Sequence, residues 1–174
     1  PWLREHGDGT GMMMSGDAEY RPVRAELWDA DARLAAMDRG GVDVQVVSST
    51  PLMFGYAAEP ERAADWCELV NERILDFCAQ APERLVPLCQ VPLQDVETAC
   101  AMVTKAAAAG HRGVHIGNHV GPRYLDDAAV VEFLTHCADE GVPVPRPEEP
   151  GTPPSPPSPD RGGTYTVQPG DTLW

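Results

Sequence analysis

Residues 20–56 read YRPVRAELWDADARLAAMDRGGVDVQVVSSTPLMFGY, and they carry the strongest signals of secondary structure in the chain. An arginine-bearing loop opens it. Asp29 can then cap a helix that runs to about Arg39, where a Gly-Gly pair ends it. Residues 42–48 form a β-branched run that is typical of a buried parallel strand. Residues 50–56 are therefore expected to form the loop after the carboxyl end of that strand.

The same alternation of helix and strand continues downstream. Residues 60–80 place apolar side chains at helical spacing, and residues 85–93 favour a strand made irregular by Pro87 and Pro92. The further elements expected are a helix from Asp95 to Gly110, a short strand over residues 113–117, a helix from Asp126 or Asp127 to Gly141, and the start of a strand at residues 142–144. This α/β pattern indicates successive βα units, in a closed barrel or in an open doubly wound sheet.

The composition changes after residue 144, which divides the chain into three parts. Residues 1–144 form the α/β part, and residues 145–163, PRPEEPGTPPSPPSPDRGG, are expected to be a disordered linker because they cannot build a core. Residues 164–174, TYTVQPGDTLW, resemble the start of a LysM domain, a module that binds peptidoglycan or chitin. That resemblance leaves cell-wall binding through the tail as an alternative function.

Composition limits the possible partners. The net charge of −14 argues against nucleic acid and anionic membranes, and no apolar run reaches the ~20 residues of a membrane span. The start, Pro1-Trp2-Leu3-Arg4, is not a signal peptide, and beginning in mid-pattern predicts a fragment. The five cysteines form no CxxC pair, so we expect free, buried thiols and a reducing, cytoplasmic location.

Residues 20–56 do not stand alone. Together with PLCQVPLQDVETAC (87–100), AAGHRGVHIGNHVG (108–121) and LDDAAVVEFLTHCADEGVPV (125–144), they resemble the metal-dependent decarboxylases of the amidohydrolase superfamily. The resemblance implies a partial (β/α)8 TIM barrel holding strands two to four and the start of strand five, where a complete barrel takes ~250 residues. It also implies a zinc-dependent carboxy-lyase of the kynurenine branch of tryptophan breakdown, a small-molecule dicarboxylate substrate and a homodimer in the intact enzyme. Another hydrolase or decarboxylase of the superfamily is a further alternative.

The family's metal ligands are not found in this sequence. They are an HxH pair on strand one, a histidine after strand five, another histidine and an aspartate, whereas here His6 is followed by Gly7 and Asp8. We therefore assign no catalytic residue and no metal ligand, and expect no zinc on this chain and no activity from it alone. The spacing of His111, His115 and His119 would align ligands on a helix, but their glycine neighbours favour strand and loop, where the three cannot converge.

The substrate-binding candidates are Arg21, Phe54 and Tyr56. In the resembled decarboxylases an arginine in this loop binds a substrate carboxylate, and Arg21 matches it within YRPVRAELWD; a planar guanidinium suits that role because it binds carboxylates bidentately. The alternative is a surface arginine paired with an acidic neighbour, Glu19 or Glu26. Loops after barrel strands form the catalytic face, so Phe54 and Tyr56 either stack on a planar conjugated substrate or seal the barrel mouth.

Overall fold

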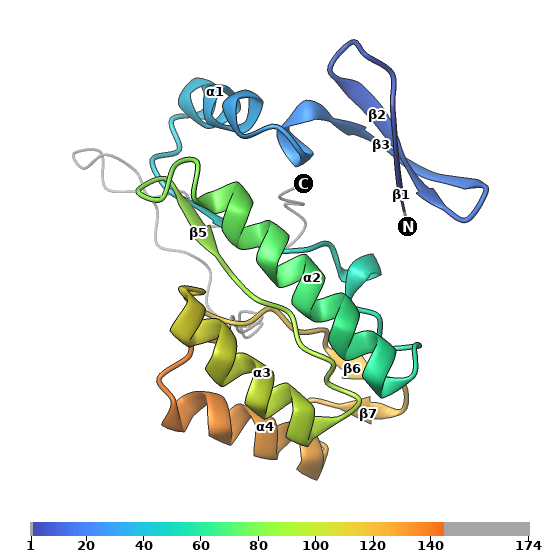
Figure 1. Cartoon of the computed structure of the whole chain (residues 1–174), viewed down its shortest axis with the longest axis vertical. Coiled ribbons are helices and arrows are strands. Elements are labelled where there is room, and N and C mark those ends of the chain that lie inside the picture. The colour runs from blue at the N-terminus through green and yellow to red at the C-terminus, as the bar shows by residue number, and fades with distance from the viewer. Residues whose placement is uncertain (1, 145–174) are drawn as a thin grey trace, which may run out of the picture.

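A three-stranded antiparallel sheet occupies the start of the computed structural model, which describes residues 2–144 (Figure 1). Its strands are β1 (Trp2–Glu5), β2 (Thr10–Ser15) and β3 (Ala18–Arg24), in that order. A bulge between Met13 and Met14 interrupts the register of β2 with β3. The prediction of a loop at the start of residues 20–56 is wrong, because residues 18–24 pair with β2. The linker and the LysM-like start predicted for residues 145–174 lie outside the described residues.

The helices agree closely with the prediction. They are α1 (Ala30–Gly40), α2 (Pro60–Cys78), α3 (Val96–Ala109) and α4 (Ala128–Asp139), with short 3-10 turns η1 (Ala25–Leu27) and η2 (Pro51–Met53). The Asp29 carboxylate accepts from Ala32 N at 3.0 Å, and Asp95 caps α3 in the same way through Thr98 N. Gly41 and Gly110 end their helices in the left-handed conformation, which glycine adopts without strain.

The parallel strands are shorter than predicted but stand in the predicted order. β4 (Gln45–Val47) pairs in parallel with β5 (Leu85–Pro87), and Cys89 forms a parallel bridge to Val114. Val114 N then donates to Pro143 O at 3.0 Å, although residues 142–144 form no strand. A separate hairpin of β6 (His119–Val120) and β7 (Arg123–Tyr124) follows the third parallel segment, which is the stretch around the bridged residue Val114. Proline shortens the ladder because it lacks the N–H that a strand donates.

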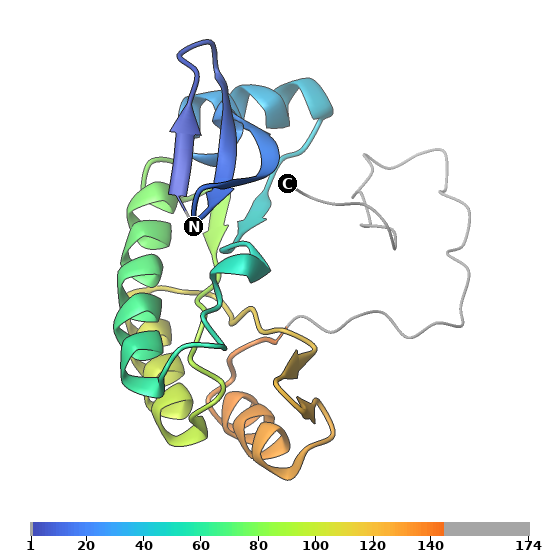
Figure 2. The same ribbon diagram turned by 90° about the vertical axis from the view of Figure 1, so that its right-hand side faces the viewer.

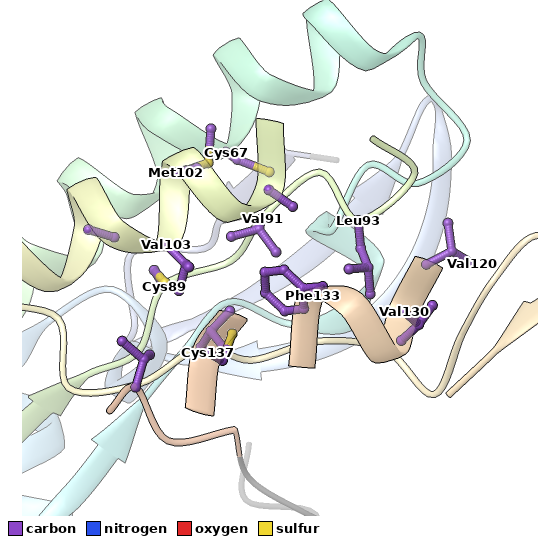
Figure 3. Close-up of a cluster of buried hydrophobic side chains, with 14 residues drawn as sticks. Cys67, Cys89, Val91, Leu93, Met102, Val103, Val120, Val130, Phe133 and Cys137 are labelled. Carbon is purple, nitrogen blue, oxygen red and sulfur yellow. The ribbon is translucent and has the colours of Figure 1, made fainter. Parts of the chain in front are cut away.

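The helices cover one side of these strands. Figure 2 shows α2 and α3 along the same side of β4 and β5. A buried cluster beneath α2, α3 and α4 centres on Phe133, with Val91, Leu93 and Val103 around it (Figure 3). A second cluster joins α1 and α2 to β4 and β5. No helix in residues 2–144 is long and apolar enough to cross a membrane.

Candidate functional site

Three polar side chains follow the carboxyl ends of the paired segments. Ser49 comes shortly after β4, Gln90 shortly after β5, and His115 directly after the bridged residue Val114. The carboxyl ends of parallel strands meet at one edge of a sheet, where α/β proteins bind their ligands. The contacts agree: the Ser49 hydroxyl donates to Oε1 of Gln90, and the Ser49 backbone is a hydrogen-bond partner of the His115 imidazole.

Gln90 is the best-anchored of these residues. It is 1% exposed, and both its main-chain polar groups bond to the Asn71 side chain of α2: Gln90 N donates to Oδ1 at 2.8 Å and Gln90 O accepts from Nδ2 at 2.9 Å. Its side-chain Nε2 donates to Met53 O at 3.1 Å and lies 3.5 Å from Cys67 Sγ. With Ser49 on Oε1, Gln90 has its hydrogen bonds satisfied in the buried interior, as a buried amide requires.

The segment of residues 50–56, hereafter the aromatic loop, covers this network. Phe54 is 3% exposed, and its ring meets that of His115 edge-on, with centroids 4.9 Å apart. Tyr56 lies 5.4 Å from Phe54 between ring centroids, and its hydroxyl accepts from Gly117 N at 3.1 Å. A Cβ at Gly117 would stand only 3.0 Å from the Tyr56 ring, so glycine permits this close approach. The Tyr56–Gly117 hydrogen bond thereby joins the loop after β4 to the loop that follows Val114.

Burial keeps the titratable groups of this region uncharged. Desolvation raises the pKa of Tyr56 to about 12, although the Gly117 hydrogen bond acts in the opposite direction. Desolvation likewise raises the pKa of the Cys67 thiol to about 11. It lowers the pKa of His115, partly offset by the Ser49 backbone bond. At neutral pH these three groups therefore stay uncharged.

The structure brings two of the three predicted substrate-binding residues together. Phe54 and Tyr56 are neighbours on the aromatic loop, where Phe54 is buried and Tyr56 is half-buried. Arg21 lies on β3, half-buried and opposite Met13 in the register, in the sheet at the other end of the molecule from β6 and β7 (Figure 1). Their roles toward substrate stay predictions.

A divalent metal does not fit the residues described. Within residues 2–144 no three His, Cys, Asp or Glu side chains gather in a group that could hold one. His111 is buried at the end of α3 with Nδ1 3.2 Å from Ala106 O, and His119 is exposed on β6 beside Tyr124. His115 faces Phe54 and Ser49. No carboxylate is among the contacts described for His115. A catalytic zinc needs three protein ligands, and the described surroundings of His115 do not supply them.

Sequence reasoning missed Ser49, Asn71, Gln90 and the contact made by His115. Two signals were present. Gln90 is a polar residue inside the apolar run LVPLCQVPL, and Asn71 stands on the apolar face of α2, four residues after Cys67. A polar side chain at a core position needs a partner. The Asn71 side chain bonds to the Gln90 main chain, and the Gln90 side chain bonds to Ser49 and Met53.

Comparison with known proteins gives consistent relatives. The chain is 30% identical over 143 residues to the 2-amino-3-carboxymuconate-6-semialdehyde decarboxylase of Dictyostelium discoideum, covering 82% of this chain and 40% of that protein. Among solved structures, the apo form of Metarhizium anisopliae IDCase matches with a TM-score of 0.66 and 25% identity, over 74% of this chain and 34% of that one. The 5-carboxyvanillate decarboxylase of Novosphingobium aromaticivorans, complexed with manganese and 4-hydroxy-3-methoxy-5-nitrobenzoic acid, matches with a TM-score of 0.61 and 24% identity, over 65% and 32%.

These likenesses confirm the fold predicted from the sequence, a partial (β/α)8 barrel. The chain spans well under half the length of the relatives it matches. The family model described as amidohydrolase matches residues 17–145, which is most of the chain. The match includes β4, β5 and every residue of the neutral network around Gln90. The chain therefore belongs to the amidohydrolase family.

Proposed function

We propose that this chain forms part of the substrate-binding face of a metal-dependent carboxy-lyase acting on 2-amino-3-carboxymuconate 6-semialdehyde, a step of tryptophan breakdown. The observation that carries the proposal is the neutral cluster at the strand ends, where buried Phe54 lies against half-buried Tyr56, in a chain 30% identical to a decarboxylase of that substrate. A planar conjugated substrate suits Tyr56, because its π-face stacks on an aromatic ring. In this proposal Tyr56 offers the ring and Phe54 supports it. Arg21, on the separate β1–β2–β3 sheet, is proposed from the family resemblance alone to bind a substrate carboxylate.

The metal of the complete enzyme is proposed to be zinc. A divalent metal is supported by the manganese-containing relative, but residues 2–144 offer no ligand set for it. We therefore assign to this chain the binding and orientation of the substrate and no step at the metal. The 174-residue chain alone is proposed to be inactive, and the complete enzyme to be a homodimer.

A chimaera tests this proposal. Residues 2–144 would replace the matching segment of the Dictyostelium decarboxylase, and the purified, metal-loaded chimaera would be assayed for loss of 2-amino-3-carboxymuconate 6-semialdehyde. We expect turnover of this substrate and little turnover of 5-carboxyvanillate. A folded, metal-loaded chimaera that fails to turn over the first substrate, or prefers the second, would overturn the proposal.

A further inference from the structure

One backbone carbonyl holds the aromatic loop in place. Met53 O accepts from Nε1 of Trp66 at 2.6 Å and from Nε2 of Gln90 at 3.1 Å. Met53 directly precedes Phe54, so the position of this carbonyl fixes the start of the backbone that carries the rings of Phe54 and Tyr56. The two donors reach it from different elements, Trp66 from α2 and Gln90 from the segment after β5.

Gln90 is fitted to this task by its chemistry. Its amide accepts from Ser49 at Oε1 and donates to Met53 at Nε2, so both ends of the side chain are used. Asn71 fixes its backbone through two bonds, which leaves the side chain little freedom. A glutamate in its place would present a second acceptor to Met53 O, and a methionine of similar length would present no donor.

We propose that Gln90 is a positioning residue: through the Met53 carbonyl it fixes the aromatic loop so that Phe54 packs on His115 and Tyr56 stays bonded to Gly117. Any effect of this positioning on a substrate rests on the proposed function. The positioning itself rests on the hydrogen bonds to the Met53 carbonyl. Two local reporters follow the loop in the full 174-residue chain without any ligand. They are the indole N–H resonance of Trp66 and the ionisation of Tyr56, which burial shifts to a pKa of about 12.

The experiment compares Gln90→Met and Gln90→Glu with the parent chain. In Gln90→Met we expect the Trp66 indole resonance, assigned with Trp66→Phe, to shift while that of Trp28 does not. The ionisation of Tyr56, followed by absorbance, should move from about 12 toward the ordinary value of about 10. Gln80→Met is the matched control, since Gln80 is exposed and bonds only to Phe77 O among the contacts described. It should leave both reporters unchanged.

Gln90→Glu adds a reversible test that also serves if Gln90→Met does not fold. A protonated carboxyl group accepts from Ser49 and donates to Met53, as the amide does, whereas an ionised one only accepts. The Trp66 resonance should therefore be native-like at low pH and displaced at pH 8. Native Trp66 and Tyr56 signals in Gln90→Met would overturn the inference, as would a native Trp66 resonance in Gln90→Glu at two pH values between which its carboxyl group is shown to ionise. Because no substrate is used, this outcome is distinct from failure of the chimaera to turn over its substrate.

Discussion

Arg21 is the residue on which carboxylate recognition depends in the proposed function. Its guanidinium is permanently charged and forks toward two oxygens, whereas the residues gathered at the strand ends are neutral. In the proposed function Arg21 supplies the charge, and Tyr56 with its neutral neighbours supplies an aromatic ring. The sequence placed Arg21 by resemblance alone, and its position on β3 is a finding of the structure.

The first prediction concerns Arg21 in the active chimaera. Arg21→Ala removes a charge-assisted pair worth ~2–5 kcal/mol when desolvated, so kcat/KM should fall roughly 30-fold to several thousand-fold. Arg21→Lys keeps the charge but loses the fork, and should already impair turnover. Zinc content should not change, and added guanidinium should restore part of the activity. Arg73→Ala, at an exposed ion pair on α2, is the control. Near-normal kcat/KM in Arg21→Ala would show that Arg21 does not bind the substrate and is a surface residue.

The second prediction concerns buried groups that resist ionisation. Burial raises the pKa of Cys89 and Cys137 from 9.0 to about 12, and that of Tyr56 from 10.0 to about 12. The unfolded chain therefore releases these protons first as pH rises. The stability these groups contribute is complete below pH 9 and is lost as pH rises through about 12. The urea midpoint, measured with a reductant present, should fall steadily from pH 9 to pH 11. Cys89→Ala should fall less steeply over this range, and a constant midpoint in the parent chain would contradict the prediction.

Among the helices and strands, the helices were predicted from local capping residues, whereas the pairing of the strands was predicted less well. The helices follow from capping residues such as Asp29, Asp95 and Gly110, whose effect is confined to one turn. The β1–β2–β3 sheet went unpredicted because MMM in β2 lacks the polar alternation of a half-buried strand, so pairing and the bulge decide its register. The aromatic loop was predicted from its place after β4. The Ser49–Gln90 contact was not, because it joins residues 41 positions apart that only the parallel ladder brings together.

The third prediction tests that ladder at Gly113. An added Cβ would stand 2.7 Å from Pro143 O and 2.9 Å from Leu88 Cδ2, and a backbone carbonyl cannot move aside cheaply. Gly113→Ala should therefore destabilise the chain by ~1–3 kcal/mol, as overpacking does in other cores. Gly40→Ala is the matched control, because Gly40 ends α1 and its added Cβ would meet Val42 at 3.8 Å. That change should be neutral or slightly stabilising. Equal urea midpoints for the two variants would contradict the account of this contact.

For the whole molecule, a metal site requires ligands brought together from distant segments. The described histidines are dispersed instead, with His111 beneath α3, His115 under the aromatic loop and His119 on an exposed hairpin. The fourth prediction is that the purified 174-residue chain, dialysed against a weak chelator, retains far less than one zinc per chain by elemental analysis. The chimaera, which regains the relative's ligands, should retain it. One tightly held zinc per chain in the parent, lost in His115→Ala, would sink this prediction and assign His115 as a ligand.

The helices cover one side of the strands (Figure 2), and among the described residues β4 lies at an open edge of its sheet. β4 pairs with β5 alone among the described strands, and Val44 and Val46 are 53% and 56% exposed there. An open strand edge with apolar side chains is a template for pairing with another chain, while the net charge of −14 opposes association. The fifth prediction is therefore concentration-dependent self-association that strengthens as salt screens the repulsion.

Sedimentation velocity at low and high salt measures this association. Val46→Lys places a charge on the strand edge and should shift the chain toward monomer at every concentration, as edge lysines do in natural sheets. Val131→Lys is the matched control, since Val131 is 45% exposed on α4, away from the strand edge. If both lysine variants strengthen association equally, the reduced net negative charge governs it and the β4 edge does not. A parent chain that stays monomeric at high concentration and high salt would refute the prediction outright.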